Sequence, residues 1–289
     1  MNTTGSTWYR SRTLIPAVML TLAGFLPSVP SWLVPHMAAQ STPFGLDLVA
    51  PVNLAGSDDA SASFQQNVLP AVTDFLNTQL SESQSVDASA MLLDPTRLEL
   101  QTASDVRVYF IGEGAGYHNT LGFTTDGSGS VTSDTAALIF PDASSSVSTY
   151  DPASTPLRTT SAPLLPGDFV DLGTLDAGTL LDFFLIANGA SGGSNVYSTE
   201  TSLNPDGINH VVAFSYAIPD SPYLIIGFED LYGGGDKDYN DLLFAVDIGA
   251  ANIKALTANS EPAFLFILGG FGAFVWSRRR PGPVQGRPA

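Results

Sequence analysis

Residues 223–247 decide the fold, and their sequence is YLIIGFEDLYGGGDKDYNDLLFAVD. Two apolar, β-prone runs, 223–228 and 242–246, flank a loop that is acidic and rich in glycine. Three consecutive glycines, 233–235, allow positive φ angles and therefore a tight bend. The stretch predicts two neighbouring strands joined by a loop whose oxygen-bearing side chains are Glu229, Asp230, Asp236, Asp238, Asn240 and Asp241.

This loop has the composition of a calcium site. Ca²⁺ binds six to eight oxygen ligands in a flexible geometry, and closely spaced Asp and Asn side chains supply such ligands. The alternation Asp236, Asp238, Asn240 matches the opening of an EF-hand loop, and Asp247 falls at its twelfth position. The sixth position is Asp241 instead of glycine, and a strand-like run follows where an EF-hand has a helix. The sequence therefore predicts a Ca²⁺ loop between strands, and a solvated acidic hairpin is the alternative.

The pattern from residue 88 onward is that of a β protein. Short apolar or alternating runs are separated by Gly, Pro, Asp and Ser, with no helical segment between them. This favours an antiparallel β-sandwich or jelly roll. The expected strands are residues 98–101, 106–111, 121–125, 136–140, 169–172, 180–187, 211–215, 223–228 and 242–248.

One amphipathic helix is expected before the strands, at about residues 63–81. Its apolar residues recur at steps of three and four, and Pro70 should kink it or delay its start. The polar face lacks Lys and Arg, which favours packing on the sheet over binding to a membrane surface or a partner. Residues 40–104 are expected to be a lead-in that carries this helix, with an edge strand possible near residue 44.

Charge and composition exclude several classes of function. Of the 289 residues, 11 are basic and 28 acidic, and residues 40–259 alone carry 5 basic and 27 acidic residues, a balance of −22. Such a body repels nucleic acid and anionic lipid and attracts divalent cations. The chain has no cysteine, which excludes thiol catalysis, Cys-type zinc sites and disulfides.

No catalytic motif is present in the sequence, which contains no G-x-S-x-G, P-loop, dinucleotide fingerprint or H-E-x-x-H. His118 and His210 each precede a strand, where a hydrogen-bonded imidazole is the commoner outcome than a catalytic or metal-binding one. Asn119 and Asp206 are possible additional metal ligands if the loops come together. A carbohydrate-binding module is an alternative function, with stacking faces from Tyr109, Tyr117, Tyr197, Tyr216, Tyr223, Tyr232 and Tyr239; a carboxylate-based hydrolase is a third.

The segment GFEDLYGGGDKDYNDLLF resembles the signature of the family called domain of unknown function 4114. The resemblance extends upstream through GAGYHNTLGF, GDFVDLG, FFLIANG and DGINHVVAF, and it covers about residues 105–248. It implies a domain of secreted and surface proteins of bacteria and no particular reaction. We therefore expect the sandwich domain at residues 105–250, followed by a linker at 251–260.

Both ends of the chain have features of export signals. Residues 1–39 resemble a signal peptide, with Arg10 and Arg12 before an apolar run, and a retained N-terminal anchor is the alternative. At the other end, Glu261-Pro262, a short apolar run and three arginines resemble a PEP-CTERM sorting tail over residues 261–289, although Ser260 replaces the first proline. That resemblance implies a transmembrane helix, processing by an exosortase-type enzyme, and bacteria that make exopolysaccharide.

Together these features predict an exported, calcium-binding, non-enzymatic protein of the cell surface or extracellular matrix. It would be anchored in the inner membrane by its C-terminal helix, with the basic tail inside. After cleavage it would lie among extracellular polysaccharide or other surface components, in a biofilm for example.

Overall fold

The computed structural model describes residues 42–80, 93–124, 126, 128–144, 164–215 and 221–259. Both the predicted signal peptide, residues 1–39, and the predicted sorting tail, residues 261–289, lie outside these ranges. Among the helices in the described ranges, none has the length and apolar character needed to cross a membrane.

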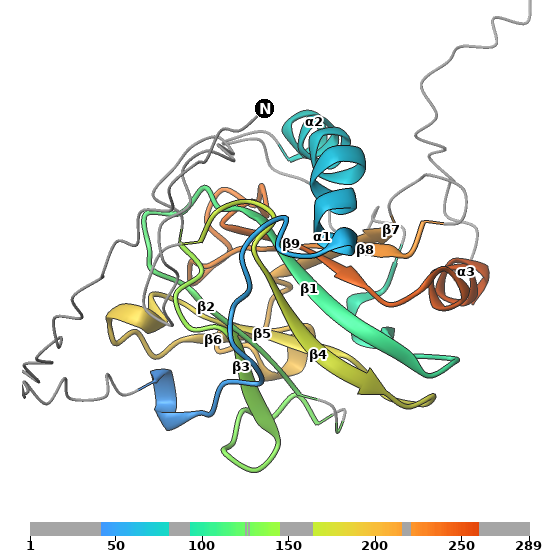
Figure 1. Ribbon diagram of the computed structural model, residues 1–289. Helices are drawn as coiled ribbons and strands as arrows, with labels where there is room; N and C mark the ends of the chain where they lie inside the picture. The colour runs from blue at the N-terminus through green and yellow to red at the C-terminus, as the bar shows by residue number, and fades with distance from the viewer. Residues whose placement is uncertain are drawn as a thin grey trace, which may run out of the picture. The chain divides into compact units, whose positions relative to one another are not determined.

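In the described residues, nine strands form two antiparallel sheets, which confirms the expected mainly β fold (Figure 1). The five-stranded sheet has the order β4 (Phe169–Leu175), β1 (Ser104–Gly112), β9 (Leu242–Asp247), β8 (Tyr223–Phe228) and β7 (Val211–Ser215). The four-stranded sheet has the order β3 (Ala136–Phe140), β2 (Thr120–Thr124), β5 (Asp182–Ile186) and β6 (Val196–Ser198). Short 3₁₀ turns lie at Pro43–Gly45, Pro95–Arg97, Gly189–Ser191 and Thr201–Leu203.

The core lies between the two sheets. The sequence of strand β9 is almost wholly apolar because both of its faces are covered, as its side-chain contacts show. Successive side chains of a strand point to opposite faces. Phe244 packs into the main core, where its ring meets Phe183 of β5 edge-on at 5.2 Å between centroids. Leu243 and Ala245 belong to a second cluster on the other face of the sheet. Because both faces of β9 are covered, every position from Leu242 to Val246 is buried.

The expected helix covers the outer face of the five-stranded sheet (Figure 1). It consists of α1 (Asp59–Ser63), a π-helical turn (Phe64–Val68) and α2 (Leu69–Gln79). It begins earlier than expected because Asp58 caps it, accepting a 2.7 Å hydrogen bond from the Ser61 backbone N–H. The π-turn lies just before Pro70, where the helix must accommodate a missing N–H.

Two segments differ from expectation. Residues 98–101 form only an isolated bridge, Glu99 to Leu180, although Leu98 and Leu100 are buried. The expected linker, residues 251–260, lies largely in helix α3 (Ala250–Asn259), which packs Ile253 against the core. The Asn252 side-chain oxygen also accepts hydrogen bonds from the backbone N–H groups of residues 101 and 102, at 2.8 and 2.9 Å. The compact body therefore extends beyond residue 250.

Candidate metal centre

Strands β8 and β9 hold the acidic loop by its two ends. They pair antiparallel up to Phe228 and Leu242, so Glu229 and Asp241 leave the sheet side by side. At the base of the loop, the backbone N–H of Asp230 donates to a carboxylate oxygen of Asp241 at 2.8 Å. The predicted arrangement of strand, acidic loop and strand is thus present in the structure.

The backbone of the loop is unusually bent. Positive φ angles occur at all three glycines, and also at Lys237 (62°) and Tyr239 (55°). Non-glycine residues in this region cost of the order of 1 kcal/mol each and persist only where surrounding structure holds them. Tyr239 is held in this way, because its side chain is buried against Leu243 and its N–H donates to Glu229 Oε2 at 3.3 Å.

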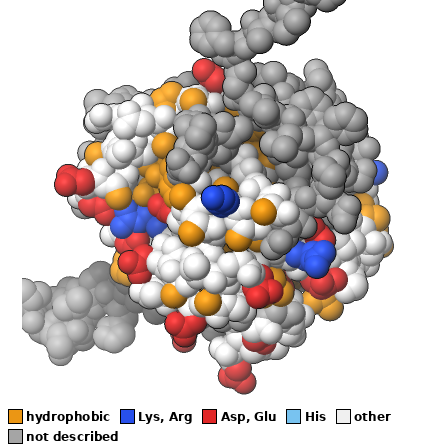
Figure 2. Space-filling model, turned by 90° about the vertical axis from the view of Figure 1, so that its right-hand side faces the viewer, with side chains coloured by type: hydrophobic (Ala, Val, Ile, Leu, Met, Phe, Trp, Pro, Cys, Tyr) orange, Lys and Arg blue, Asp and Glu red, His pale blue; other side chains and the backbone are white. Residues whose placement is uncertain are grey.

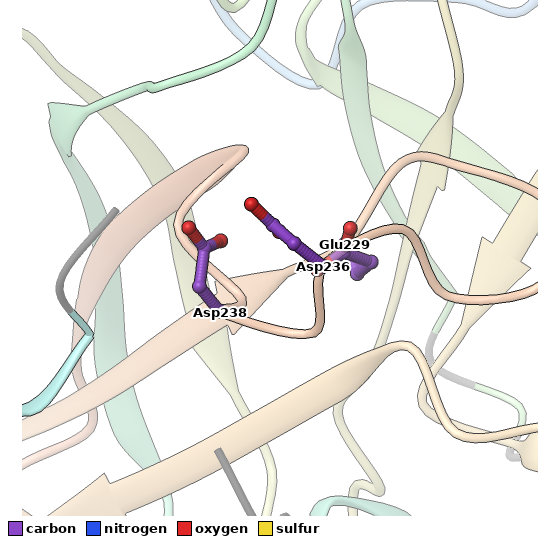
Figure 3. Close-up of side chains that lie close together, drawn as sticks. All are labelled: Glu229, Asp236 and Asp238. Carbon is purple, nitrogen blue, oxygen red and sulfur yellow. The ribbon is translucent and has the colours of Figure 1, made fainter. Parts of the chain in front are cut away.

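The bend brings three carboxylates together. Each of Glu229, Asp236 and Asp238 offers an oxygen, and these oxygens all lie within 4.8 Å of one another. Glu229 is 1% exposed and Asp238 2% exposed, whereas Asp236 lies at the surface. All three project from the β8–β9 loop (Figure 3). The cluster therefore has a buried base and one member at its opening.

Gly235 packs directly against the cluster. A Cβ atom built on it would lie 2.0 Å from Glu229 Oε1, and its φ is +45°. No other residue type fits this position without displacing the Glu229 carboxylate. The third glycine of the run thus determines where a candidate ligand lies.

Burial and mutual repulsion shift the acidity of the cluster. Burial, followed by the charge of Asp241, raises the pKa of Glu229 to about 8, and Asp236 and Asp238 add to the rise. Burial and the neighbouring charge of Asp230 raise the pKa of Asp241 to about 7. Figure 2 shows further acidic side chains scattered over the left and lower parts of one face, with a few basic ones among them. Without a cation, burial and the neighbouring carboxylates therefore favour the protonated form of Glu229.

The other predicted ligands lie near the cluster but make different contacts. A carboxylate oxygen of Asp230 accepts from the Asn119 amide at 2.7 Å. The Asn240 amide donates to Asp238 Oδ2 at 2.9 Å and to the backbone oxygen of Leu80 at 3.3 Å. Asp241 accepts from the backbone at the base of the loop, as described above. Asn240 thus contacts the cluster directly through Asp238, whereas Asn119 and Asp230 bond to each other beside it.

Asp206, the remaining predicted ligand, is paired with His210 instead. His210 is 0% exposed and stacks on Tyr197 at 3.8 Å between ring centroids. Its Nδ1 lies 2.9 Å from the carbonyl oxygen of Glu229, and its Nε2 lies 2.9 Å from Asp206 Oδ2. Burial acts to raise the pKa of Asp206, but hydrogen bonds from the Gly233 N–H, His210 and the Ile208 N–H outweigh it and lower that pKa.

His118 and His210 both make hydrogen bonds, which is the outcome that their positions before strands favour. The His210 ring fixes the start of the acidic loop through the Glu229 carbonyl. The side chain of His118 is 53% exposed, and its Nδ1 lies 3.2 Å from Asp142 and 3.0 Å from the Ser144 hydroxyl. Neither imidazole belongs to the carboxylate cluster found in the described chain.

Two residues that shape this region are not marked as such by the sequence pattern. Tyr239 was expected to offer an exposed ring, and it is instead 5% exposed and anchors the bend. Asn188 adopts a left-handed backbone (φ 52°), and its N–H donates to the Asn119 side-chain oxygen at 2.9 Å. The Asn-Gly pair at 188–189 signals such a turn, but only the fold shows what it touches.

The fold and the loop define a two-sheet β protein with a candidate cation site at one hairpin. Residues 175–249, from the end of β4 through β9, match the family model described as domain of unknown function (DUF4114). This match contains the whole acidic loop and is narrower than the resemblance noted in the sequence. Comparison with curated proteins and with solved structures gave no match.

Proposed function

We propose that the protein is an exported, non-enzymatic, calcium-binding protein of the bacterial surface or extracellular matrix. The observation that carries the proposal is the convergence of three carboxylates, two of them buried, within 4.8 Å. Burying negative charges is costly unless a cation or protons neutralise them. A bound ion would remove both the repulsion and the burial penalty at this loop.

The donor set favours Ca²⁺ over other metals. All three converging groups are carboxylates, with no cysteine in the chain and no imidazole in the cluster found among the described residues. Hard oxygen donors suit Ca²⁺, and a bent loop with carbonyls and water within reach can complete its coordination without strict geometry. Mg²⁺ demands a nearly ideal octahedron and keeps its waters, so a loop of this kind should bind it more weakly.

The same geometry argues against a hydrolase. Glu229 and Asp238 are 1% and 2% exposed, so a polysaccharide chain has no access to them in this conformation. A glycosidase needs two carboxyl groups that flank a bound sugar in an open cleft. Placement outside the cell, anchoring by the tail and association with exopolysaccharide rest on the two terminal signals in the sequence.

Calcium affinity is expected to depend strongly on pH. The pKa of Glu229 in the metal-free folded protein, about 8, lies above its ordinary value of 4.5. Protonation of Glu229 stabilises the metal-free folded state fully below pH 4.5, and this stabilisation is lost as the pH rises through about 8. Ca²⁺ binds only the ionised carboxylate, so protons compete with the ion over the same range of pH. Calorimetry should show affinity rising up to about tenfold per pH unit between about pH 6 and about pH 8.

The companion measurement is proton release. Titrations in buffers of different ionisation enthalpy should reveal about one proton released per ion bound near neutral pH. Affinity that stays flat over this interval, with no proton released, would contradict a site built on Glu229.

A further inference from the structure

A cleft of about 540 Å³ opens beside the acidic loop. One wall is the segment after β5, residues 187–195, and the other is the loop itself, residues 230–235. Tyr117 also lines it. Its volume falls within the range of small-ligand sites, roughly 300–1,000 Å³.

Exposed apolar side chains gather at this cleft. Five large apolar residues of the described chain are exposed, and three of them line it: Tyr117 (41%), Leu231 (44%) and Tyr232 (67%). Of the other tyrosines expected to stack on sugars, Tyr109, Tyr197 and Tyr239 are buried, Tyr223 is half-buried and Tyr216 lies outside the described residues. The exposed tyrosine rings of the described residues are therefore concentrated at one place.

The polar groups in the cleft are mostly amides and hydroxyls. Asn188, Ser194 and Asn195 contribute them, and each can both donate and accept hydrogen bonds. The Asn188 side-chain oxygen accepts from the His118 N–H at 3.0 Å, which leaves its NH₂ group without a partner in the described part of the chain. Asn188 is also held by Asn119, so its donor is fixed in place before a ligand arrives.

We propose that this cleft binds a neutral oligosaccharide. A pyranose ring has an apolar C–H face, which suits the tyrosine rings, and a rim of hydroxyls, which suits amides and hydroxyls. The one charged lining residue is Asp230, and the whole chain has a formal charge of −17, so an anionic sugar is disfavoured. An uncharged peptide is the competing occupant, and the experiment below distinguishes the two.

Binding in the cleft is coupled to the cation site, and this coupling rests on the proposed calcium function. Tyr232 and Gly235 line the cleft and belong to the same loop as Glu229 and Asp236. Asn119 joins the two walls, because its amide donates to Asp230 and its oxygen accepts from the Asn188 N–H. A cation that stiffens the loop fixes Tyr232, which lowers the entropy lost when a sugar binds.

The test is calorimetric titration of the full-length chain with neutral tetrasaccharides of glucose, mannose and galactose, with and without Ca²⁺. Tetragalacturonate and an uncharged tetrapeptide serve as competing probes. We expect at least one neutral sugar to bind, and Tyr232→Ala and Tyr117→Ala each to weaken it about tenfold. Tyr232→Phe should keep most of the affinity because it keeps the ring, and Leu203→Ala, exposed but outside the cleft, should have no effect.

The outcomes separate this proposal from the calcium site. Binding of the peptide or tetragalacturonate alone, or no binding of any neutral sugar at millimolar concentration, overturns the cleft proposal. So does sugar binding that both tyrosine variants leave unchanged. Sugar binding that needs the tyrosines but ignores Ca²⁺ leaves the cleft standing and removes only the coupling, whereas calcium binding without sugar binding removes the cleft alone.

Discussion

Ca²⁺ added to the metal-stripped full-length chain is expected to raise its melting temperature by about 5–10 °C. A ligand present at about 100 times its Kd stabilises the folded state by about 2.7 kcal/mol, and 1 kcal/mol corresponds to about 2–4 °C in a protein of this size. The stabilisation arises because the ion neutralises Glu229, Asp236 and Asp238 where they converge. Scanning fluorimetry with Ca²⁺, Mg²⁺ and EDTA measures it.

A double variant shows whether this response comes from the cluster. Asp236→Asn with Asp238→Asn removes two charges while keeping shape, and it should abolish the calcium response. Asp134→Asn is the matched control, because Asp134 is an exposed acid outside the cluster. A double variant that still responds as the wild type does would place the ion elsewhere.

Gly235→Ala is expected to weaken calcium binding about 100-fold or more and to destabilise the fold by about 1–3 kcal/mol. The new Cβ would lie 2.0 Å from Glu229 Oε1, so the carboxylate must leave its place in the cluster. Alanine also tolerates a positive φ poorly, which accounts for about 1 kcal/mol of the loss. Calcium calorimetry and chemical denaturation measure the two effects separately.

Gly233→Ala is the control that separates the effect of backbone strain from the effect of the clash between the new Cβ and Glu229. Gly233 has a φ of +86°, but a Cβ there meets no atom within 4 Å. This variant should lose stability through its backbone while keeping most of its calcium affinity. Equal losses of affinity in the two variants would show that the position of Glu229 does not control the site.

The sequence predicted the β8–β9 hairpin well because the residues with high strand propensity are also the residues that the fold buries. Both flanking strands are β-prone and buried apart from Tyr223 and Asp247 at their outer ends, and the acidic residues gather in the loop between them. Helix α3 escaped prediction because its residues, AANIKALTAN, have no marked apolar face, and its place depends on Asn252 bonding a segment about 150 residues earlier in the chain. Strand β6 has three residues, too few to show an alternating pattern.

The composition of the site was predictable, but the geometry of its ligands was not. Six oxygen-bearing residues in one short loop signalled a cation, yet only Glu229, Asp236 and Asp238 converge in the structure. The positive φ angles of the bend determine which side chains face one another. Lys237 and Tyr239 both have positive φ angles, and nothing in the sequence pattern indicates this. Asn119 and Asp206 do reach the loop, but as hydrogen-bond partners of Asp230 and of the Gly233 N–H.

The most direct test is titration calorimetry of Ca²⁺ into the metal-stripped full-length chain, beside the Glu229→Gln variant. We expect saturable binding to the wild type in the presence of excess Mg²⁺, and a large loss of affinity when the buried carboxylate becomes an amide. Heats no larger than dilution for the wild type, or equal affinity in the two proteins, would contradict this expectation.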